Sequence, residues 1–206
     1  MNKLLKVALV VIVSQMSLVG QLQAETRALV EGDDYQVMGP KGTKSPEVME
    51  FFSYACGHCY TMETFVNQFK KGNAGIKVVP VPTDLGHPQW TIYMKAYYLG
   101  ELLKVLDKSH SKIFHQINVE GKHIVKEQDL KAFFVALGVD PVQYDKANKS
   151  FALSAKLRKA KQLARKYQIA GTPTFVANQR YKLNNQILKT TEMIEKALKE
   201  LTVVAL

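Results

Sequence analysis

The sequence predicts an α/β layer that is interrupted by an all-helical insertion. Strand-like and helical patterns alternate over residues 48–52, 57–70 and 76–81, only helical patterns follow over residues 90–150, and a β-like run returns at residues 174–183. Strand–helix–strand order implies two parallel strands joined by a right-handed crossover. The helical block therefore separates two parts of one α/β layer.

The first 24 residues are typical of a secretory signal peptide. Lys3 and Lys6 precede the apolar run 7–13, and the small residue Ala24 ends the segment. Spanning a bilayer takes about 20 apolar residues, so a retained membrane anchor is the less favoured alternative. We expect cleavage after Ala24 and export of the remaining chain.

Composition limits the classes of function. The chain of 206 residues carries a formal net charge of +10 and contains only two cysteines. It is long enough to bury a real core, so it is not a small scaffold held together by disulfides. A nucleic-acid partner is not expected, because an exported protein rarely meets one and no recognition motif is present. Nothing in the sequence predicts a cofactor.

The first part of the chain predicts two parallel strands around one helix. A short strand is expected over residues 35–38, before the turn-rich stretch 39–46. The compact apolar run 48–52 indicates a central strand covered on both faces. Apolar residues recur at helical spacing over 57–70, glycines end that helix, and the next strand is predicted over residues 76–81.

The rest of the chain is mainly helical. Helices are predicted over residues 90–106, 109–119, 126–137, 141–148 and 151–167. Asp140 and Pro141 form a good helix start, with an acceptor at the cap and proline at the first position. The short runs 174–177 and 181–183 can pair as strands, and an amphipathic helix is expected over residues 191–201.

The two cysteines carry the predicted chemistry. Cys56 and Cys59 lie two residues apart, directly after the strand 48–52 and at the start of a helix. Unpaired N–H groups and the helix dipole favour a thiolate there, which predicts a reactive dithiol for thiol–disulfide exchange. A structural disulfide is a weaker alternative because so short a loop constrains the unfolded chain little. Zinc binding by Cys56, His58 and Cys59 lacks the usual fourth ligand.

Two motifs together resemble a known family. Glu50-Phe51-Phe52-Ser53 running into Cys56-Gly57-His58-Cys59, followed by Gly171-Thr172-Pro173-Thr174-Phe175, resembles the DsbA family of bacterial periplasmic thiol oxidases and its cis-proline loop. The resemblance implies a thioredoxin-like fold with an inserted all-helical domain. The implied domains are a thioredoxin-like domain over residues 25–86 and 161–206, with the insertion over residues 87–160.

The sequence departs from the family pattern at two places. Members of the family usually have Pro-His between the cysteines, whereas this chain has Gly57 and His58, the pair typical of eukaryotic protein disulfide isomerases. The residue before the loop proline is commonly valine, and here it is Thr172. Both positions tune redox potential and partner choice, so we expect a potential inside the superfamily range of roughly −270 to −120 mV.

The resemblance also implies residue roles. Cys56 is the exposed nucleophile, stabilised by the helix N-terminus and by a hydrogen bond or positive charge from His58, and Cys59 is the buried resolving cysteine. Glu50 is a buried acid beneath Cys59 that influences proton transfer; the alternative is a glutamate facing solvent at a strand end. Glu63 matches a second family acid, although an ordinary surface glutamate has the same pattern.

The loop at residues 171–175 is the implied client-binding element. We expect Pro173 to be cis and the Thr172 backbone to pair with an extended client peptide as an added strand. Four histidines in or beside the insertion, and the basic run 156–166, are interpreted as ordinary packing or surface residues. The histidines are His87, His110, His115 and His123.

The predicted function is a periplasmic oxidoreductase that gives its Cys56–Cys59 bridge to exported proteins. By resemblance, a quinone-linked membrane oxidase of the DsbB type reoxidises the protein, and a monomer is favoured. An isomerase or reductase using the same site is the first alternative, favoured by Gly57, His58 and Thr172. The second alternative is a non-catalytic periplasmic chaperone with an inert disulfide.

Overall fold

The computed structural model describes residues 27–203, so the predicted signal peptide and its cleavage position lie outside the described residues. The elements in chain order are β1 (Tyr35–Val37), β2 (Glu47–Phe52), α2 (Gly57–Gly72), β3 (Lys77–Pro82), the 3-10 turn η1 (Pro88–Trp90), α3 (Thr91–Leu102), α4 (Leu106–Asn118), α5 (Glu127–Ala136), α6 (Pro141–Asn148), α7 (Phe151–Lys166), β4 (Thr174–Ala177), β5 (Tyr181–Leu183) and α8 (Thr191–Val203). None of the helices in this part of the chain has the length and apolarity needed to cross a bilayer.

The strands form one mixed sheet in the order β1-β5-β4-β2-β3. The predicted parallel pair is confirmed, because β2 pairs with β3 in parallel and Val48 lies opposite Val78. The predicted pairing of β4 with β5 is also confirmed, with Ala177 opposite Tyr181. On its other side β2 pairs antiparallel with β4, which brings the strand before the cysteines beside the strand after Pro173.

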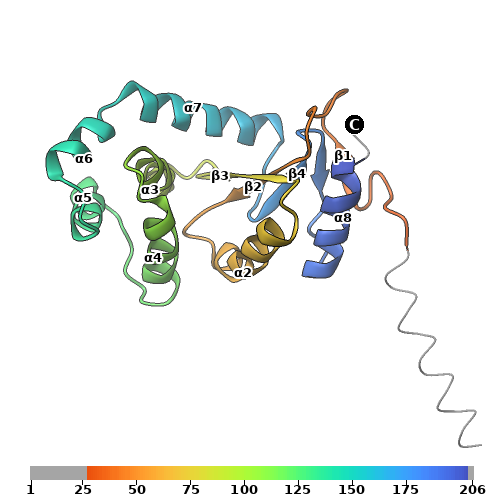
Figure 1. The fold of residues 1–206 in the computed structure, drawn as a ribbon, viewed down its shortest axis with the longest axis horizontal. Coiled ribbons are helices and arrows are strands. Elements are labelled where there is room, and N and C mark those ends of the chain that lie inside the picture. Colours follow the sequence, from red (N-terminus) through yellow and green to blue (C-terminus); the bar gives the residue numbers. More distant parts are fainter. Residues whose placement is uncertain (1–26, 204–206) are drawn as a thin grey trace, which may run out of the picture.

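Helices cover both faces of the sheet (Figure 1). Helices α2 and α8 lie on one face and α7 crosses the other. Side chains alternate along β2: Val48 packs with the α2 and α8 residues, whereas Met49 and Phe51 belong to the opposite core. The acidic residue Glu50 follows the Val48 face, where it is 2% exposed. The apolar run of β2 is thus explained by burial on both sides, with one ionisable group inside.

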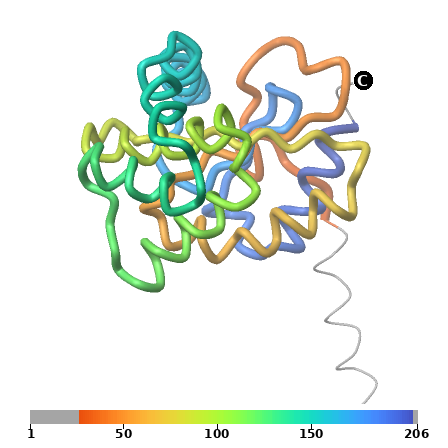
Figure 2. The backbone as a smooth tube through the Cα atoms, turned by 60° about the vertical axis from the view of Figure 1, so that its left-hand side comes forward, coloured from red at the N-terminus to blue at the C-terminus, as the bar shows by residue number. Residues whose placement is uncertain are grey.

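The remaining helices, α3 to α6, gather at one end of the molecule, beside the sheet (Figures 1 and 2). The two helices predicted over residues 90–106 and 109–119 are present, but the break between them lies earlier, because α3 ends at Leu102 and α4 begins at Leu106. Lys104 adopts a φ of 57°, which no glycine or proline in the sequence indicates. Gly100 permits the sharp reversal, since a Cβ there would lie 2.5 Å from the Ser109 hydroxyl oxygen on α4.

The predicted domain boundaries after residues 86 and 160 stay predictions. Helix α7 continues through the second of them, from the helical end of the molecule to the face of the sheet (Figure 1). Its buried residue Ala160 and the following Tyr167 both belong to the core that also contains Phe51 of β2. Helix α7 therefore ties the two parts of the core together.

A buried asparagine joins the sheet to the last helix. Asn178 follows β4 with a φ of 48° and is fully buried. Its side-chain oxygen accepts from the Glu47 N–H at 2.9 Å and from the Thr43 hydroxyl at 3.1 Å. Its amide nitrogen donates to the carbonyl oxygens of Leu201 and Thr202. Asn178 thereby connects β2, the turn after β4 and the end of α8.

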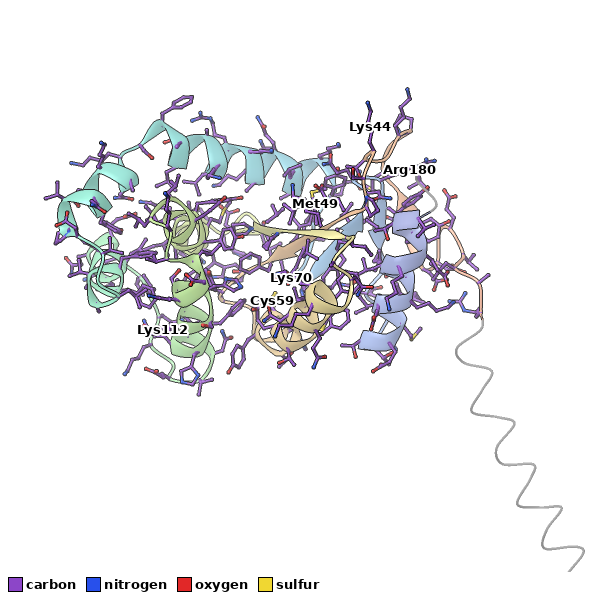
Figure 3. All side chains as sticks on the ribbon, in the orientation of Figure 1. Lys44, Met49, Cys59, Lys70, Lys112 and Arg180 are labelled. Atoms are coloured by element: carbon purple, nitrogen blue, oxygen red, sulfur yellow. The ribbon has the colours of Figure 1, made fainter. Side chains whose placement is uncertain are left out.

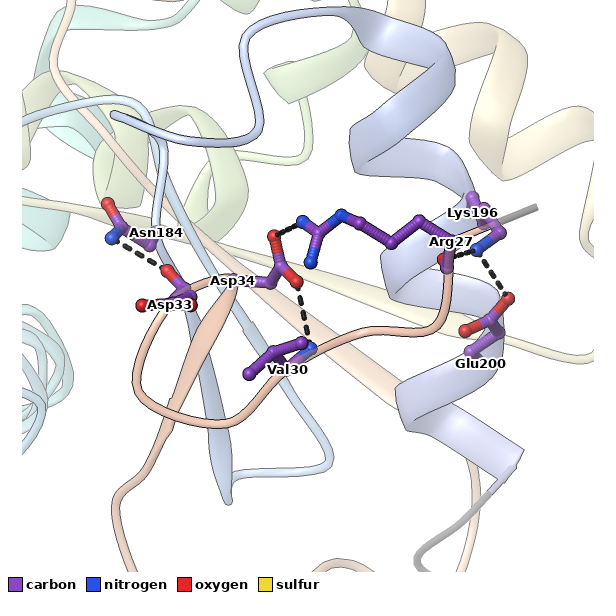
Figure 4. A network of polar contacts seen from close by, with 7 residues as sticks. All are labelled: Arg27, Val30, Asp33, Asp34, Asn184, Lys196 and Glu200. Atoms are coloured by element: carbon purple, nitrogen blue, oxygen red, sulfur yellow. Dashed lines mark hydrogen bonds and ion pairs between the residues drawn. The ribbon is translucent and has the colours of Figure 1, made fainter. Parts of the chain in front are cut away.

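A polar network fastens the first described residues to the rest of the molecule (Figure 4). The buried Asp34 carboxylate accepts from the Val30 N–H at 2.8 Å and pairs with Arg27. Burial raises the pKa of this carboxyl, but these hydrogen bonds and the Arg27 charge outweigh it and lower the pKa below its usual range. Lys196 of α8 donates to the Arg27 carbonyl oxygen. The chain before β1 is thus anchored against α8.

Candidate active site

The two cysteines lie where β2 leads into α2. Cys56 is the N-cap residue of α2, and its Sγ atom accepts the Cys59 N–H at 3.3 Å. The Cys56 N–H donates to the Ser53 carbonyl oxygen at 3.0 Å, which closes the turn before the helix. Cys56 is partly exposed and Cys59 is fully buried, and both are free thiols. The predicted exposure of the first cysteine and burial of the second are confirmed.

The surroundings separate the pKa values of the two thiols. Hydrogen bonds from the Cys59 thiol and the Thr172 side chain, together with the backbone N–H groups of Cys59 and His58, lower the pKa of Cys56 to about 5, although burial opposes this. Burial is the main cause that raises the pKa of Cys59 far above its usual range. Near neutral pH the reduced site therefore holds one partly exposed thiolate, Cys56, beside one buried thiol, Cys59.

The loop before β4 faces Cys56. The Thr172 carbonyl oxygen lies 3.3 Å from the Cys56 Sγ atom, and the Thr172–Pro173 peptide bond is cis, as expected. A groove of about 500 Å³ opens on this loop and is lined by Gly171, Thr172, Pro173 and polar side chains of the segment after β5. The structure thus brings Cys56 and the predicted client-binding loop into direct contact.

Glu50 lies under the sheet on the α2 side. It is 2% exposed, and its Oε1 atom has no hydrogen-bond partner among the described residues. Burial, followed by the negative charge of Glu63, raises the pKa of Glu50 to about 8. Lys70, on α2 with Cys59 (Figure 3), lowers that pKa in part. The alternative of a solvent-facing strand-end glutamate is wrong.

His58 and Glu63, the other two residues considered near the cysteines, differ in how far they are buried. His58 is exposed, and it is its backbone N–H that contributes to the low pKa of Cys56. Glu63 is mostly buried, with 19% of its side chain exposed, and its carboxylate lies 3.3 Å from the Nε2 atom of His110 on α4. Glu63 is therefore not an ordinary surface residue, and its partner comes from a distant helix.

Sequence reasoning missed the contribution of α4 to this region. His110 also lies 2.7 Å from the Tyr54 hydroxyl oxygen, just before the cysteines. Asn118, at the end of the same helix, donates to the Tyr54 carbonyl oxygen at 3.1 Å. The only signal in the sequence is that His110 precedes the buried Phe114 by one helical turn, which places both on the same face.

The arrangement has close relatives among known proteins. The family model described as the DSBA-like thioredoxin domain matches residues 90–199. The chain is 31% identical over 139 residues to the thiol:disulfide interchange protein DsbA of Pseudomonas syringae pv. tomato, a match covering 67% of this chain and 64% of that protein. It is 30% identical over 168 residues to DsbA of Pseudomonas aeruginosa, covering 79% of each.

Solved structures agree with these matches. The crystal structure of Pseudomonas aeruginosa DsbA covers 86% of this chain, with a TM-score of 0.76 and 25% sequence identity, and 96% of that structure is covered. The predicted thioredoxin-like fold with an inserted helical domain is confirmed. The sequence matches, the fold and the position of the two cysteines together show that this chain belongs to the DsbA family of thiol:disulfide oxidoreductases.

Proposed function

We propose that this protein is a periplasmic oxidase that introduces disulfide bonds into exported proteins. The observation that carries the proposal is the environment of Cys56, which lowers the pKa of its thiol to about 5. Stabilising that thiolate stabilises the reduced protein, so the oxidised protein accepts electrons more readily. A low thiol pKa also makes Cys56 a good leaving group when a client disulfide is released.

The transfer proceeds in two exchange steps. A client thiolate attacks the Cys56 sulfur, a client–Cys56 bond forms, and the Cys56–Cys59 bond breaks. The departing Cys59 thiolate takes a proton from Glu50, whose pKa of about 8 keeps it mostly protonated at neutral pH. A second client thiolate then attacks the client sulfur of the mixed disulfide, and Cys56 leaves as a thiolate. The client is oxidised by two electrons and the protein is reduced.

The client is held through its backbone. β5 pairs with β4 only at Val176 and Ala177, so on this side the start of β4 borders the groove instead of β5, as the Thr172 loop does. An extended client segment adds there as a strand, and main-chain pairing reads little sequence. Broad recognition of this kind suits unfolded, reduced proteins arriving in the periplasm.

Export and reoxidation complete the proposed cycle. The signal peptide over residues 1–24 directs the chain to the periplasm, where disulfides persist. A quinone-linked membrane oxidase of the DsbB type restores the Cys56–Cys59 bridge. The protein acts as a monomer in this scheme.

The deciding measurement is the redox potential of Cys56 and Cys59 in equilibrium with glutathione. We expect a potential well above that of thioredoxin, which is about −270 mV, and a mostly oxidised site in cells. A thioredoxin-like potential with a mostly reduced site would instead support the reductase or isomerase alternative. In the doubly substituted Cys56→Ser, Cys59→Ser protein, a surviving phenotype would support the chaperone alternative.

A further inference from the structure

His110 of α4 bridges two parts of the redox region. Its Nδ1 atom lies 2.7 Å from the Tyr54 hydroxyl oxygen, and its Nε2 atom lies 3.3 Å from the Glu63 carboxylate. The imidazole packs against a pair of neighbouring aromatic rings, with centroids 5.5 Å away at Phe52 and 5.1 Å away at Phe114. Its side chain is 21% exposed, so the ring is held in one place by both polar and apolar contacts.

The hydrogen bond with Tyr54 leaves the other nitrogen of His110 facing Glu63. Burial raises the pKa of Tyr54 well above its usual range, so the phenol keeps its proton and can donate to Nδ1. The neutral imidazole then carries its proton on Nε2, 3.3 Å from the Glu63 carboxylate. The protonated imidazole carries a proton on both nitrogens. In either state, an N–H group of His110 faces the Glu63 carboxylate.

The carboxylate held in this way acts on the buried acid of the site. Glu63 is the largest charged contributor to the raised pKa of Glu50, after burial. The other titratable groups around this region are Tyr54 before α2, Lys70 on α2 and Tyr97 on α3. Lys70 acts in the opposite direction to Glu63. The position of the Glu63 side chain therefore influences when Glu50 ionises.

We propose that His110 is a positioning residue of the redox site, which holds the Glu63 carboxylate in place and thereby sets the pH range over which Glu50 can protonate Cys59. This inference rests on the proposed thiol–disulfide exchange. It assigns α4, part of the helical insertion, a role in the proton transfer of a site built on the sheet. His110 touches neither client nor cysteine and acts only through Glu63.

The test is the pH profile of a single turnover of the oxidised mature protein with a reduced cysteine peptide, with the rate expressed per client thiolate. In the wild type we expect the rate to fall as pH rises through the ionisation of Glu50, near pH 8. This fall is the alkaline limb of the pH profile. If the limb is absent in the variant Glu50→Gln, which cannot ionise at this position, the limb is assigned to Glu50. In Glu63→Gln the limb moves to lower pH by about one unit, because a negative charge is removed.

Two His110 variants then separate positioning from packing. His110→Phe keeps the aromatic ring but frees Glu63 to turn toward water, so we expect the same shift to lower pH as in Glu63→Gln. In the double variant the two shifts do not add. His110→Gln retains a donor for Glu63 and keeps the limb near its wild-type position. His115→Phe is the matched control on α4, because His115 pairs with the surface Glu120 instead.

The proposal is overturned if His110→Phe leaves the limb unmoved, if the two shifts add, or if His115→Phe moves the limb equally. His110→Gln also covers the case in which His110→Phe does not fold. The redox potential decides the proposed function separately. A reductase-like potential with the predicted limb shifts would reject the oxidase but support the role of His110.

Discussion

The Cys56 sulfur lies 3.3 Å from the carbonyl oxygen of Thr172, a residue 116 positions later in the chain. The contact exists because β2 and β4 are antiparallel neighbours in the sheet, so the end of β2 lies beside the start of β4. A peptide that pairs with the backbone at Thr172 would therefore lie next to the Cys56 sulfur.

The low pKa of Cys56 makes the stability of the reduced protein depend on pH. The folded value of about 5 lies below the unfolded value of about 8.5. The stabilisation is fully present above the unfolded value and is lost as pH falls through the folded value. We therefore expect the Tm of the reduced protein, minus that of the oxidised protein, to increase between pH 5 and pH 8. Parallel Tm curves would contradict this.

Replacing Thr172 by valine tests how the loop contacts Cys56. The substitution retains the Thr172 carbonyl oxygen beside Cys56 but removes the side-chain hydrogen bond that, after the one from Cys59, does most to lower the pKa of Cys56. We expect the pKa of Cys56, measured from the ultraviolet absorbance of its thiolate, to rise by about half a unit or more, and half a unit corresponds to about 0.7 kcal/mol. An unchanged pKa would show that the threonine side chain does not stabilise the thiolate. Cys59→Ala provides the comparison variant, because it removes the side-chain hydrogen bond from Cys59 that is the main cause of the low pKa.

Glu50→Gln should alter stability in a pH-dependent way. The folded pKa of about 8 is above the unfolded value of this carboxyl. The stabilisation that the protonated side chain contributes is therefore fully present below the unfolded pKa and is lost as pH rises through 8. The wild type thus loses stability between about pH 4.5 and pH 8, and the variant does not. We expect similar stability at pH 4 and a gain of about 4 kcal/mol for the variant at pH 8.

Urea unfolding at several pH values measures this difference. The exposed exchange Glu200→Gln serves as the control for the loss of a charge. An identical pH dependence for wild type and Glu50→Gln would mean that Glu50 is already ionised at neutral pH, which would remove it as a proton donor to Cys59.

Asn178→Ala should be strongly destabilising. The substitution leaves the Glu47 N–H and the carbonyl oxygens of Leu201 and Thr202 without the partner that Asn178 provides, and it places alanine at a φ of 48°. We expect a loss of about 3 kcal/mol or more in the free energy of unfolding. Asn184→Ala, which removes two exposed hydrogen bonds, one to the Asp33 carbonyl oxygen and one from the Gln186 N–H, should cost about 1 kcal/mol. Equal losses would contradict the linking role of Asn178.

Local patterns predicted the elements near the cysteines well. The strand before Cys56, the helix after it and the two last strands follow from apolar spacing, which is a property of neighbouring residues. The break at Lys104 has no such pattern, because it depends on how closely α3 and α4 pack at Gly100. The sequence therefore predicted two helices here but placed the break between them a few residues too late.

The same distinction applies to the site. Cys56, Cys59 and Glu50 lie within a few residues of each other, and the resemblance of their motif to a family identified them. The pairing of Glu63 with His110 joins residues 47 positions apart through the packing of α2 and α4, and the Asn178 bonds reach from Thr43 to Thr202. Contacts of this range depend on the assembled tertiary structure, and the spacing of residues along the chain does not encode them.

The pairing of β2 with β4 also has a consequence for biosynthesis. Ribosomes deliver the chain from its N-terminus, so the dithiol is made more than one hundred residues before the strand that lies beside it. A nascent chain that has not yet produced β4 presents its thiols without the Thr172–Pro173 loop that lies against Cys56. Thiol exchange by the complete site therefore begins only after nearly the whole polypeptide has been synthesised.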